Sequence, residues 1–117
     1  MLKPAVLSIV LALFAAGALA DSDAETAGLP SAQEIDVEAA QKIFQKSCRA
    51  CHGNKAQGAA SYPALADKSP EYIAEKLRIY RSGEKIGPNS ILMISHAKKL
   101  SDEDIANISV YVATAFD

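Results

Sequence analysis

Both cysteines of this 117-residue chain lie within one five-residue stretch, Cys48-Arg49-Ala50-Cys51-His52. Two thiols three positions apart, followed at once by an imidazole, allow four kinds of chemistry. They could form a disulfide, a redox-active dithiol, part of a zinc site, or an anchor for a larger group. The spacing alone admits all four, so the choice depends on the rest of the chain.

Three of these alternatives find little support elsewhere in the sequence. A redox dithiol is expected beside a βαβ pattern, and no segment shows the alternating, β-branched pattern of a strand. A structural zinc site needs four ligands and is usually built from cysteine and histidine, and after Cys48, Cys51 and His52 the chain has one more such residue, His96. A disulfide between these cysteines would close a very short loop and would stabilise the chain little.

The C-x-x-C-H spacing is instead typical of covalent haem attachment. In that chemistry each thiol adds to a vinyl group, and the histidine becomes an axial ligand of the iron. Thiols one short turn apart can reach two vinyl groups on one edge of the macrocycle. This attachment places the imidazole of the following histidine beneath the iron. We therefore expect Cys48 and Cys51 to hold one haem c and His52 to ligate its iron.

A haem iron held only by His52 would keep an open sixth position. The chain offers two residues that could fill it. Met93 is the only methionine after the first residue, and it has apolar neighbours on both sides. His96, three residues later, is the competing ligand and begins a polar run. A lone methionine is ordinarily a core residue, but its setting here favours Met93 as the thioether ligand.

The first twenty residues have the features of a signal peptide. Lys3 gives a positive start, residues 5–16 are apolar apart from one serine, and Ala18-Leu19-Ala20 is a small-x-small cleavage site. The apolar run is shorter than the roughly twenty residues that span a bilayer; an uncleaved anchor is the alternative. We expect cleavage after Ala20 and export to the periplasm, outside the bacterial cytoplasm, where haem attachment of this kind takes place.

The remaining chain divides into a flexible acidic lead-in, residues 21–35, and one domain, residues 36–117. Low hydrophobicity with Gly, Pro and Ser indicates the flexible segment. Residues 21–38 carry six acidic and no basic side chains, whereas residues 39–99 carry eleven basic and four acidic ones, a net charge of +7. Such an asymmetry can steer a charged partner. A domain this small, without tryptophan, often depends on a cofactor for its core.

Three segments have helical patterns, at about residues 37–46, 70–82 and 102–115. Their start signals are Asp36 for the first, Ser69 with Pro70 for the second, and a capping box of Ser101 and Asp104 for the third. Gly83 is placed to end the second helix. Residues 53–68 and 84–99 are expected to be irregular, and loops of that length usually serve function or wrap around something.

From about Val37 to Phe116 the sequence resembles the small soluble class I monohaem cytochromes c of bacteria, of the cytochrome c-553 type. The resemblance rests on four stretches: "AQKIFQKSCRACHG", "YPALADKSPEYIAEKL", "RSGEKIGPNSILM" and "LSDEDIANISVYVATAF". It implies an all-α fold, the small cytochrome c fold, in which three main helices and long loops wrap around one covalent haem.

The resemblance also implies roles for single residues. Met93 would be the distal iron ligand, and the carbonyl of Pro63 would accept a hydrogen bond from the His52 imidazole, which fixes the ring tautomer. Phe44 and Tyr111 would lie where the first and third helices cross, nearly at right angles. Many relatives have glycine at the position of Ala40, so we expect a slightly wider crossing here.

With two axial ligands the iron would be closed to substrates, so the resemblance implies an electron carrier and not an enzyme. Methionine ligation raises the reduction potential above that of a bis-histidine haem. We expect a periplasmic single-electron carrier, not membrane-spanning once mature and without nucleic-acid partners. It would accept electrons from a membrane reductase or dehydrogenase and pass them to an oxidase or reductase.

Two other functions remain as alternatives: a haem subunit dedicated to one dehydrogenase, and a ligand-binding or peroxidatic haem protein with an open sixth site. A lysine-ringed haem edge would dock on an acidic partner, with Lys55, Lys98 and Lys99 as candidates.

Overall fold

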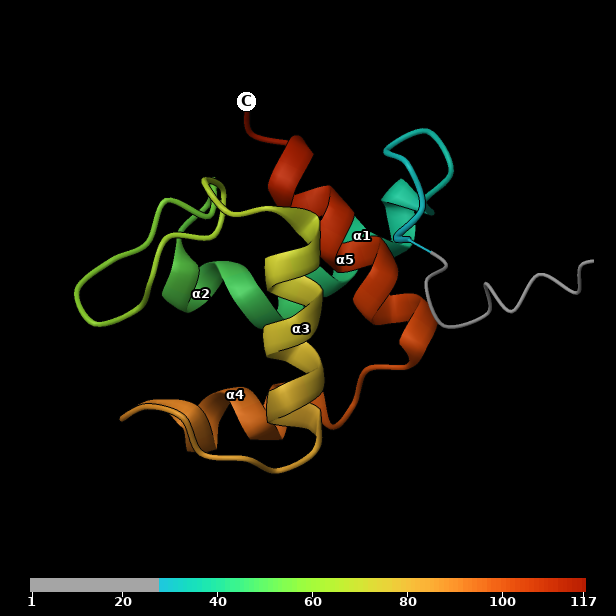
Figure 1. Ribbon diagram of the computed structural model, residues 1–117. Coiled ribbons are helices and arrows are strands. Elements are labelled where there is room, and N and C mark those ends of the chain that lie inside the picture. The colour runs from blue at the N-terminus through green and yellow to red at the C-terminus, as the bar shows by residue number, and fades with distance from the viewer. Residues whose placement is uncertain (1–27) are drawn as a thin grey trace, which may run out of the picture.

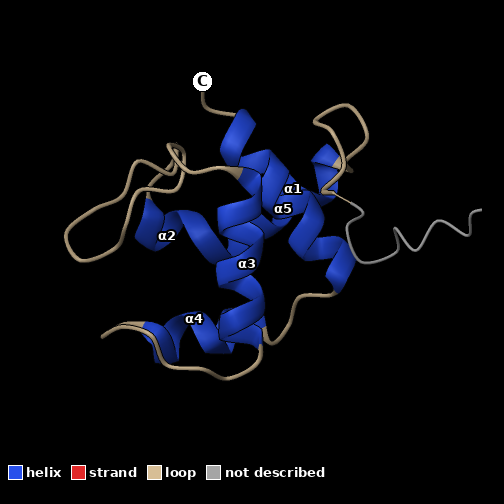
Figure 2. Ribbon diagram, in the orientation of Figure 1, coloured by secondary structure: helices blue, strands red, loops and turns tan. Residues whose placement is uncertain are grey.

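The computed structural model describes residues 28–117; the expected signal peptide, 1–20, and the first part of the lead-in, 21–27, lie outside the described residues. Within residues 28–117 the secondary structure is helical, apart from one isolated bridge between Ala59 and Tyr62 (Figure 2). The elements are α1 (Val37–Ile43), the π-helix η2 (Phe44–Cys48), α2 (Arg49–His52), α3 (Pro70–Arg81), α4 (Ser90–Ala97) and α5 (Asp102–Thr114). The all-α prediction is confirmed.

The first helical segment is longer than predicted. Asp36 caps α1 as expected, because its Oδ1 accepts a hydrogen bond from the backbone N–H of Ala39 at 3.0 Å. The helix was expected to end at Lys46, and this is wrong. The backbone instead widens into the π turn η2 and continues as α2 to His52, so both cysteines lie on helical backbone. Such π turns occur mostly as single-turn insertions and often at functional sites.

Both ends of α3 follow their sequence signals. Ser69 Oγ accepts a hydrogen bond from the backbone N–H three residues on, at 3.1 Å, and a proline occupies the first helical position. After the helix, the N–H groups of Gly83 and Glu84 donate to the carbonyls of Tyr80 and Ile79 at 2.9 and 3.3 Å. Gly83 has φ of +90°, which an L side chain rarely adopts. This pair of bonds is the Schellman ending that glycine favours.

The start of α5 is the capping box that the sequence predicts. The Ser101 hydroxyl accepts from the N–H of Asp104, and the Asp104 carboxylate accepts from the N–H of Ser101, both at 3.0 Å. At the far end of α3, the guanidinium of Arg81 reaches Asp102 at 2.6 Å and the carbonyl of Leu100 at 3.3 Å. These bonds hold the end of α3 against the start of α5.

The core lies where α5 packs on both α1 and α3 (Figure 1). Phe44, 2% exposed, has its ring centroid 6.0 Å from that of Tyr111 and 5.2 Å from that of Phe116. Ala40 is fully buried on α1. The N-terminal and C-terminal helices are therefore joined by an aromatic cluster, as the resemblance implied for Phe44 and Tyr111.

Helix α4 corrects the prediction that residues 84–99 are irregular. The Ser90 hydroxyl accepts hydrogen bonds from the N–H groups of Ile86 and Gly87 at 2.8 and 2.7 Å, and this closes the turn that leads into the helix. Met93 therefore sits on a helix and not in a loop. Within residues 28–117, no helix combines the length and the apolar character needed to cross a bilayer.

Candidate haem site

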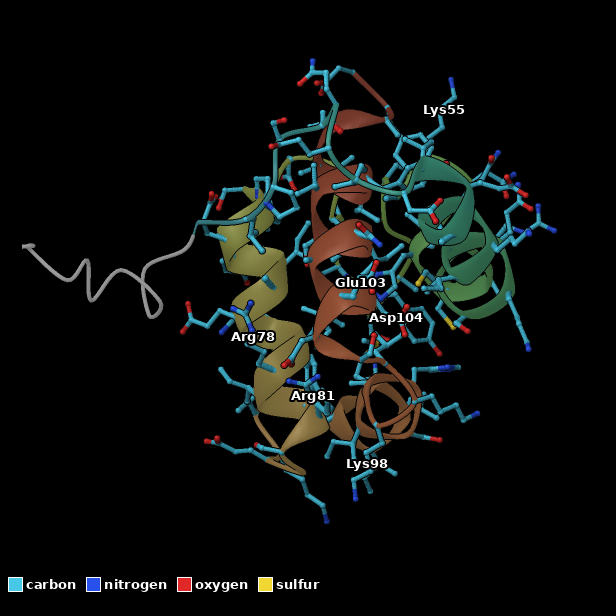
Figure 3. The ribbon with its side chains drawn as sticks, turned by 90° about the vertical axis from the view of Figure 1, so that its right-hand side faces the viewer. Lys55, Arg78, Arg81, Lys98, Glu103 and Asp104 are labelled. Carbon is cyan, nitrogen blue, oxygen red and sulfur yellow. The ribbon has the colours of Figure 1, made fainter. Side chains whose placement is uncertain are left out.

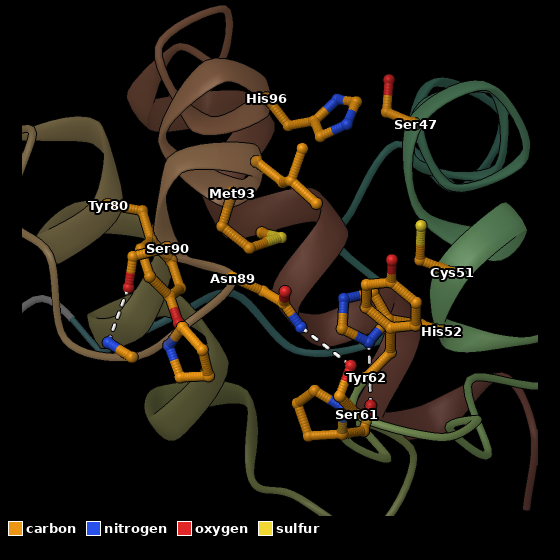
Figure 4. A pocket seen from close by; sticks show the side chains of 14 residues that line it. Ser47, Cys51, His52, Ser61, Tyr62, Tyr80, Asn89, Ser90, Met93 and His96 are labelled. Atoms are coloured by element: carbon orange, nitrogen blue, oxygen red, sulfur yellow. Dashed lines mark hydrogen bonds between the residues drawn. The ribbon is translucent and has the colours of Figure 1, made fainter.

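His52 is buried at the end of α2, and its ring is held by one backbone contact. Its Nδ1 lies 2.8 Å from the carbonyl oxygen of Pro63 (Figure 4). A carbonyl oxygen can only accept, so Nδ1 carries the proton and donates it. The lone pair of the neutral ring is then on Nε2, the nitrogen that remains available to a metal. This is the contact that the resemblance implied for Pro63.

The segment between α2 and α3 is folded so that the Pro63 carbonyl reaches the ring. The N–H of Gly58 donates to the carbonyl of His52 at 2.7 Å, and Ala59 and Tyr62 exchange backbone bonds of 3.0 and 2.9 Å. Gly58 has φ of +82°, and a Cβ there would lie 2.7 Å from a backbone nitrogen. Only glycine fits this turn without distortion.

His52 and Met93 share the walls of three cavities, of about 330, 40 and 270 Å³. His52 comes from α2 and Met93 from α4, two helices that Figure 1 shows on the same side of α3. In Figure 4 the Met93 sulfur and the His52 ring both point into the largest cavity. An imidazole and a thioether therefore face the same open space.

The two cysteines line different cavities. Cys51 borders the 330 Å³ cavity and Cys48 the 40 Å³ cavity, and both thiols are free. Burial raises the pKa of the Cys48 thiol to about 11, so the group is protonated at neutral pH. Its sulfur lies 3.8 Å from the carbonyl oxygen of Ile43. The disulfide considered from the sequence is absent from this part of the chain.

His96 also reaches the site, from the same helix as Met93. It lines the 330 and 40 Å³ cavities but not the 270 Å³ cavity. Figure 4 shows its ring close to Ser47, on the far side of Met93 from His52. The structure thus brings both candidate ligands to the site, with Met93 in the more central position.

The cavity walls fit a flat, largely apolar group. The wall of the smallest cavity includes several apolar side chains: Ile43, Leu65, Ile73, Leu77, Leu100, Ile108 and Val112. With two thiols on one side and an imidazole and a thioether in the shared walls, the donor set is the one that haem c uses. The residues present therefore fit a covalently bound haem.

Several residues that complete the site carry no local signal in the amino-acid sequence. The Asn89 side-chain amide donates to the Ser61 hydroxyl at 3.1 Å, which joins the two long connecting segments at the wall of the largest cavity. Tyr80 of α3 lines two of the cavities. Such contacts join residues that are distant in the chain, so no local sequence pattern predicts them.

A profile of the cytochrome c family matches residues 37–116. The chain belongs to the cytochrome c family. This cytochrome c is 44% identical to "cytochrome c-554(548)" of Halomonas halodenitrificans, over 58% of this chain and 83% of that protein. It is 36% identical to "cytochrome c-554(547)" of Halothiobacillus neapolitanus, over 68% of this chain and 96% of that protein.

A third relative, 34% identical, is the "cytochrome subunit of sulfide dehydrogenase" of Chlorobaculum tepidum, matched over 63% of this chain and 64% of that protein. Membership confirms the small monohaem cytochrome c fold that the resemblance implied. It also confirms one covalent haem c as the cofactor, and it makes this protein a haem electron-transfer protein.

Proposed function

We propose that Cys48 and Cys51 form the two thioether bonds to haem c and that His52 and Met93 are its axial ligands. One observation carries this assignment: His52 and Met93 are common to the walls of all three cavities. The fixed Nδ1 proton of His52 supports it, since that proton leaves Nε2 free to face the iron.

Bound haem c supplies one-electron chemistry at the iron, which cycles between the ferric and ferrous states. The chain's own residues prevent substrate binding at the iron. His52 and Met93 would hold the iron between them, so that no position on it would remain for a substrate, and the apolar wall would exclude water. Nδ1 of His52 keeps its proton and donates it to the Pro63 carbonyl. Thioether ligation favours the ferrous state and raises the reduction potential above that of a bis-histidine haem.

The role that follows is that of a single-electron carrier in the periplasm. It would receive electrons from a membrane reductase or dehydrogenase and deliver them to an oxidase or reductase, without being an enzyme itself. The charge pattern and the N-terminal segment, residues 1–20, support export and partner steering.

Helix α4 offers the docking surface for such partners. Ile91 and Leu92 are 64% and 51% exposed beside Met93, and Lys98 and Lys99 follow at its end. Lys55 does not belong to this surface, because Figure 3 shows it at the opposite end of the molecule from Lys98. A partner with an acidic rim around an apolar centre matches α4 best.

A haem subunit dedicated to one dehydrogenase is the second candidate. The relative named as the cytochrome subunit of sulfide dehydrogenase favours it. The two functions differ in the lifetime of the complex with the donor. A carrier separates from its partners as salt rises, because screening weakens exposed charge pairs. A subunit would copurify with the dehydrogenase at high salt.

The test is made on the exported protein, expressed from the full-length sequence. We expect a mass increase of one haem, a reversible one-electron redox titration, and a ferrous form that does not bind carbon monoxide. Met93→Ala serves as the positive control, since its open sixth position should bind carbon monoxide. A wild-type ferrous protein that readily binds carbon monoxide would contradict the closed site and favour a ligand-binding or peroxidatic role.

A further inference from the structure

The 270 Å³ cavity differs from the other two, because no cysteine lines it. The vinyl groups of haem lie toward one edge of the ring, and its two propionate carboxylates lie toward the opposite edge. A ring tethered by Cys48 and Cys51, which line the other two cavities, therefore directs its carboxylates away from them. The cavity without a cysteine is where a partner for those carboxylates is needed.

Lys76 of α3 is the one lysine or arginine in the wall of this cavity. The other titratable groups there are His52 of α2 and the two tyrosines of α3, Tyr72 and Tyr80. The connecting segments contribute Pro63, Leu65 and Ile86, and α4 contributes Met93. The wall thus presents a cation and hydroxyl donors, and it includes no aspartate or glutamate.

The ammonium of Lys76 has no carboxylate partner among the ion pairs within residues 28–117. It lies over the ring of Tyr72, with Nζ 5.4 Å from the ring centroid, and the lysine is half-buried. An ammonium in the wall of a cavity that includes no other lysine or arginine and no carboxylate is placed to pair with an incoming carboxylate.

We infer that Lys76 binds a propionate of haem c through its ammonium group. This inference rests on the proposed attachment through Cys48 and Cys51. A charge-assisted bond of this kind is stronger than a neutral one. An opposite charge within about 4–6 Å lowers a carboxyl pKa by roughly 1–3 units. The propionate beside Lys76 therefore stays ionised, and the reduction potential changes with pH only in more acidic solution.

Lys68 provides a matched control. Its Nζ lies 5.7 Å from the centroid of the same Tyr72 ring, but it is paired with Asp67 at 3.6 Å and does not line the cavity. Lys68→Gln removes a cation from the same tyrosine without changing any residue of the cavity wall. Lys76→Arg keeps a cation at the site.

The experiment measures the reduction potential of the purified haem protein against pH. In Lys76→Gln we expect a lower potential wherever the propionate is ionised, because losing a cation favours the ferric state. We also expect its pH-dependent region to move up by about 1–3 pH units. Lys68→Gln and Lys76→Arg should keep the wild-type profile.

Two results would overturn the inference: a Lys76→Gln profile that superimposes on that of Lys68→Gln, or a Lys76→Arg profile that moves as Lys76→Gln does. Covalent haem and the sulfur-to-iron charge-transfer band are measured on the same samples. Their absence from the wild-type protein would count against the proposed function and not against Lys76 alone.

Discussion

The Nδ1 atom of His52 lies 2.8 Å from the carbonyl oxygen of Pro63, eleven residues further along the chain. This single backbone acceptor selects the ring tautomer and turns Nε2 toward the cavity that His52 shares with Met93. The acceptor belongs to the main chain, so its position depends on the path of the loop. The conformation of that loop is therefore part of the site.

Gly58 is the position at which the loop is most sensitive to substitution. In Gly58→Ala the new Cβ would lie 2.7 Å from the nitrogen of Ala64 and 2.9 Å from the oxygen of Tyr62, at φ of +82°. We expect the free energy of unfolding to fall by about 2–3 kcal/mol, measured by guanidinium titration, because the clash adds to the backbone strain. Gly83→Ala is the control, because φ is +90° there but no atom lies within 4 Å of the new Cβ. It should cost only about 1 kcal/mol; equal losses in the two variants would contradict a role for the close approach at Gly58.

Phe44 should be the most costly aromatic residue to truncate. It is 2% exposed and packs against Tyr111 and Phe116, so Phe44→Ala leaves a cavity between the first and last helices. We expect a loss of about 3–5 kcal/mol in the free energy of unfolding, and a smaller loss for Phe44→Leu. A loss below about 1 kcal/mol for the alanine variant would show that the two helices are joined in some other way.

The thiol of Cys48 gives a pH-dependent prediction for the Cys51→Ala chain prepared without haem. Burial raises the pKa of this thiol from 9.0 to about 11. The folded state therefore holds the proton more tightly than the unfolded chain, and stability is lost as the pH rises from 9 toward 11. Alkylation of Cys48, followed by mass spectrometry, should accelerate over the same range because the thiolate is the nucleophile. An alkylation rate near pH 9 equal to that of an exposed thiol would show that Cys48 is not buried in the haem-free chain.

Several elements of the fold could be predicted because their signals are local. Ser69 and the pair Ser101 and Asp104 each bond to backbone groups within three residues, and Gly83 adopts the conformation that only glycine tolerates well. The attachment motif is equally local, since its chemistry requires the C-x-x-C-H spacing. These features are visible in the sequence without knowledge of the rest of the fold.

Helix α4 could not be predicted in the same way. It is short, Asn89 gives it no side-chain cap, and exposed Ile91 and Leu92 break the apolar stripe that marks a helix packed on a core. The π turn at Phe44–Cys48 also leaves no local sequence signal. The place of Lys76 in the cavity wall depends on how α3 packs against other segments, so it emerges only from the three-dimensional arrangement.

The identity of the sixth ligand is the central claim, and His96 is the residue that could contradict it. Both side chains come from α4, but Met93 lines all three cavities and His96 only two. The decisive measurement is the sulfur-to-iron charge-transfer band in the absorption spectrum of the ferric protein. We predict that the band is present in the wild type, persists in His96→Ala and vanishes in Met93→Ala. A band absent from the wild type, or lost in His96→Ala while Met93 is intact, would contradict methionine ligation and the function built on it.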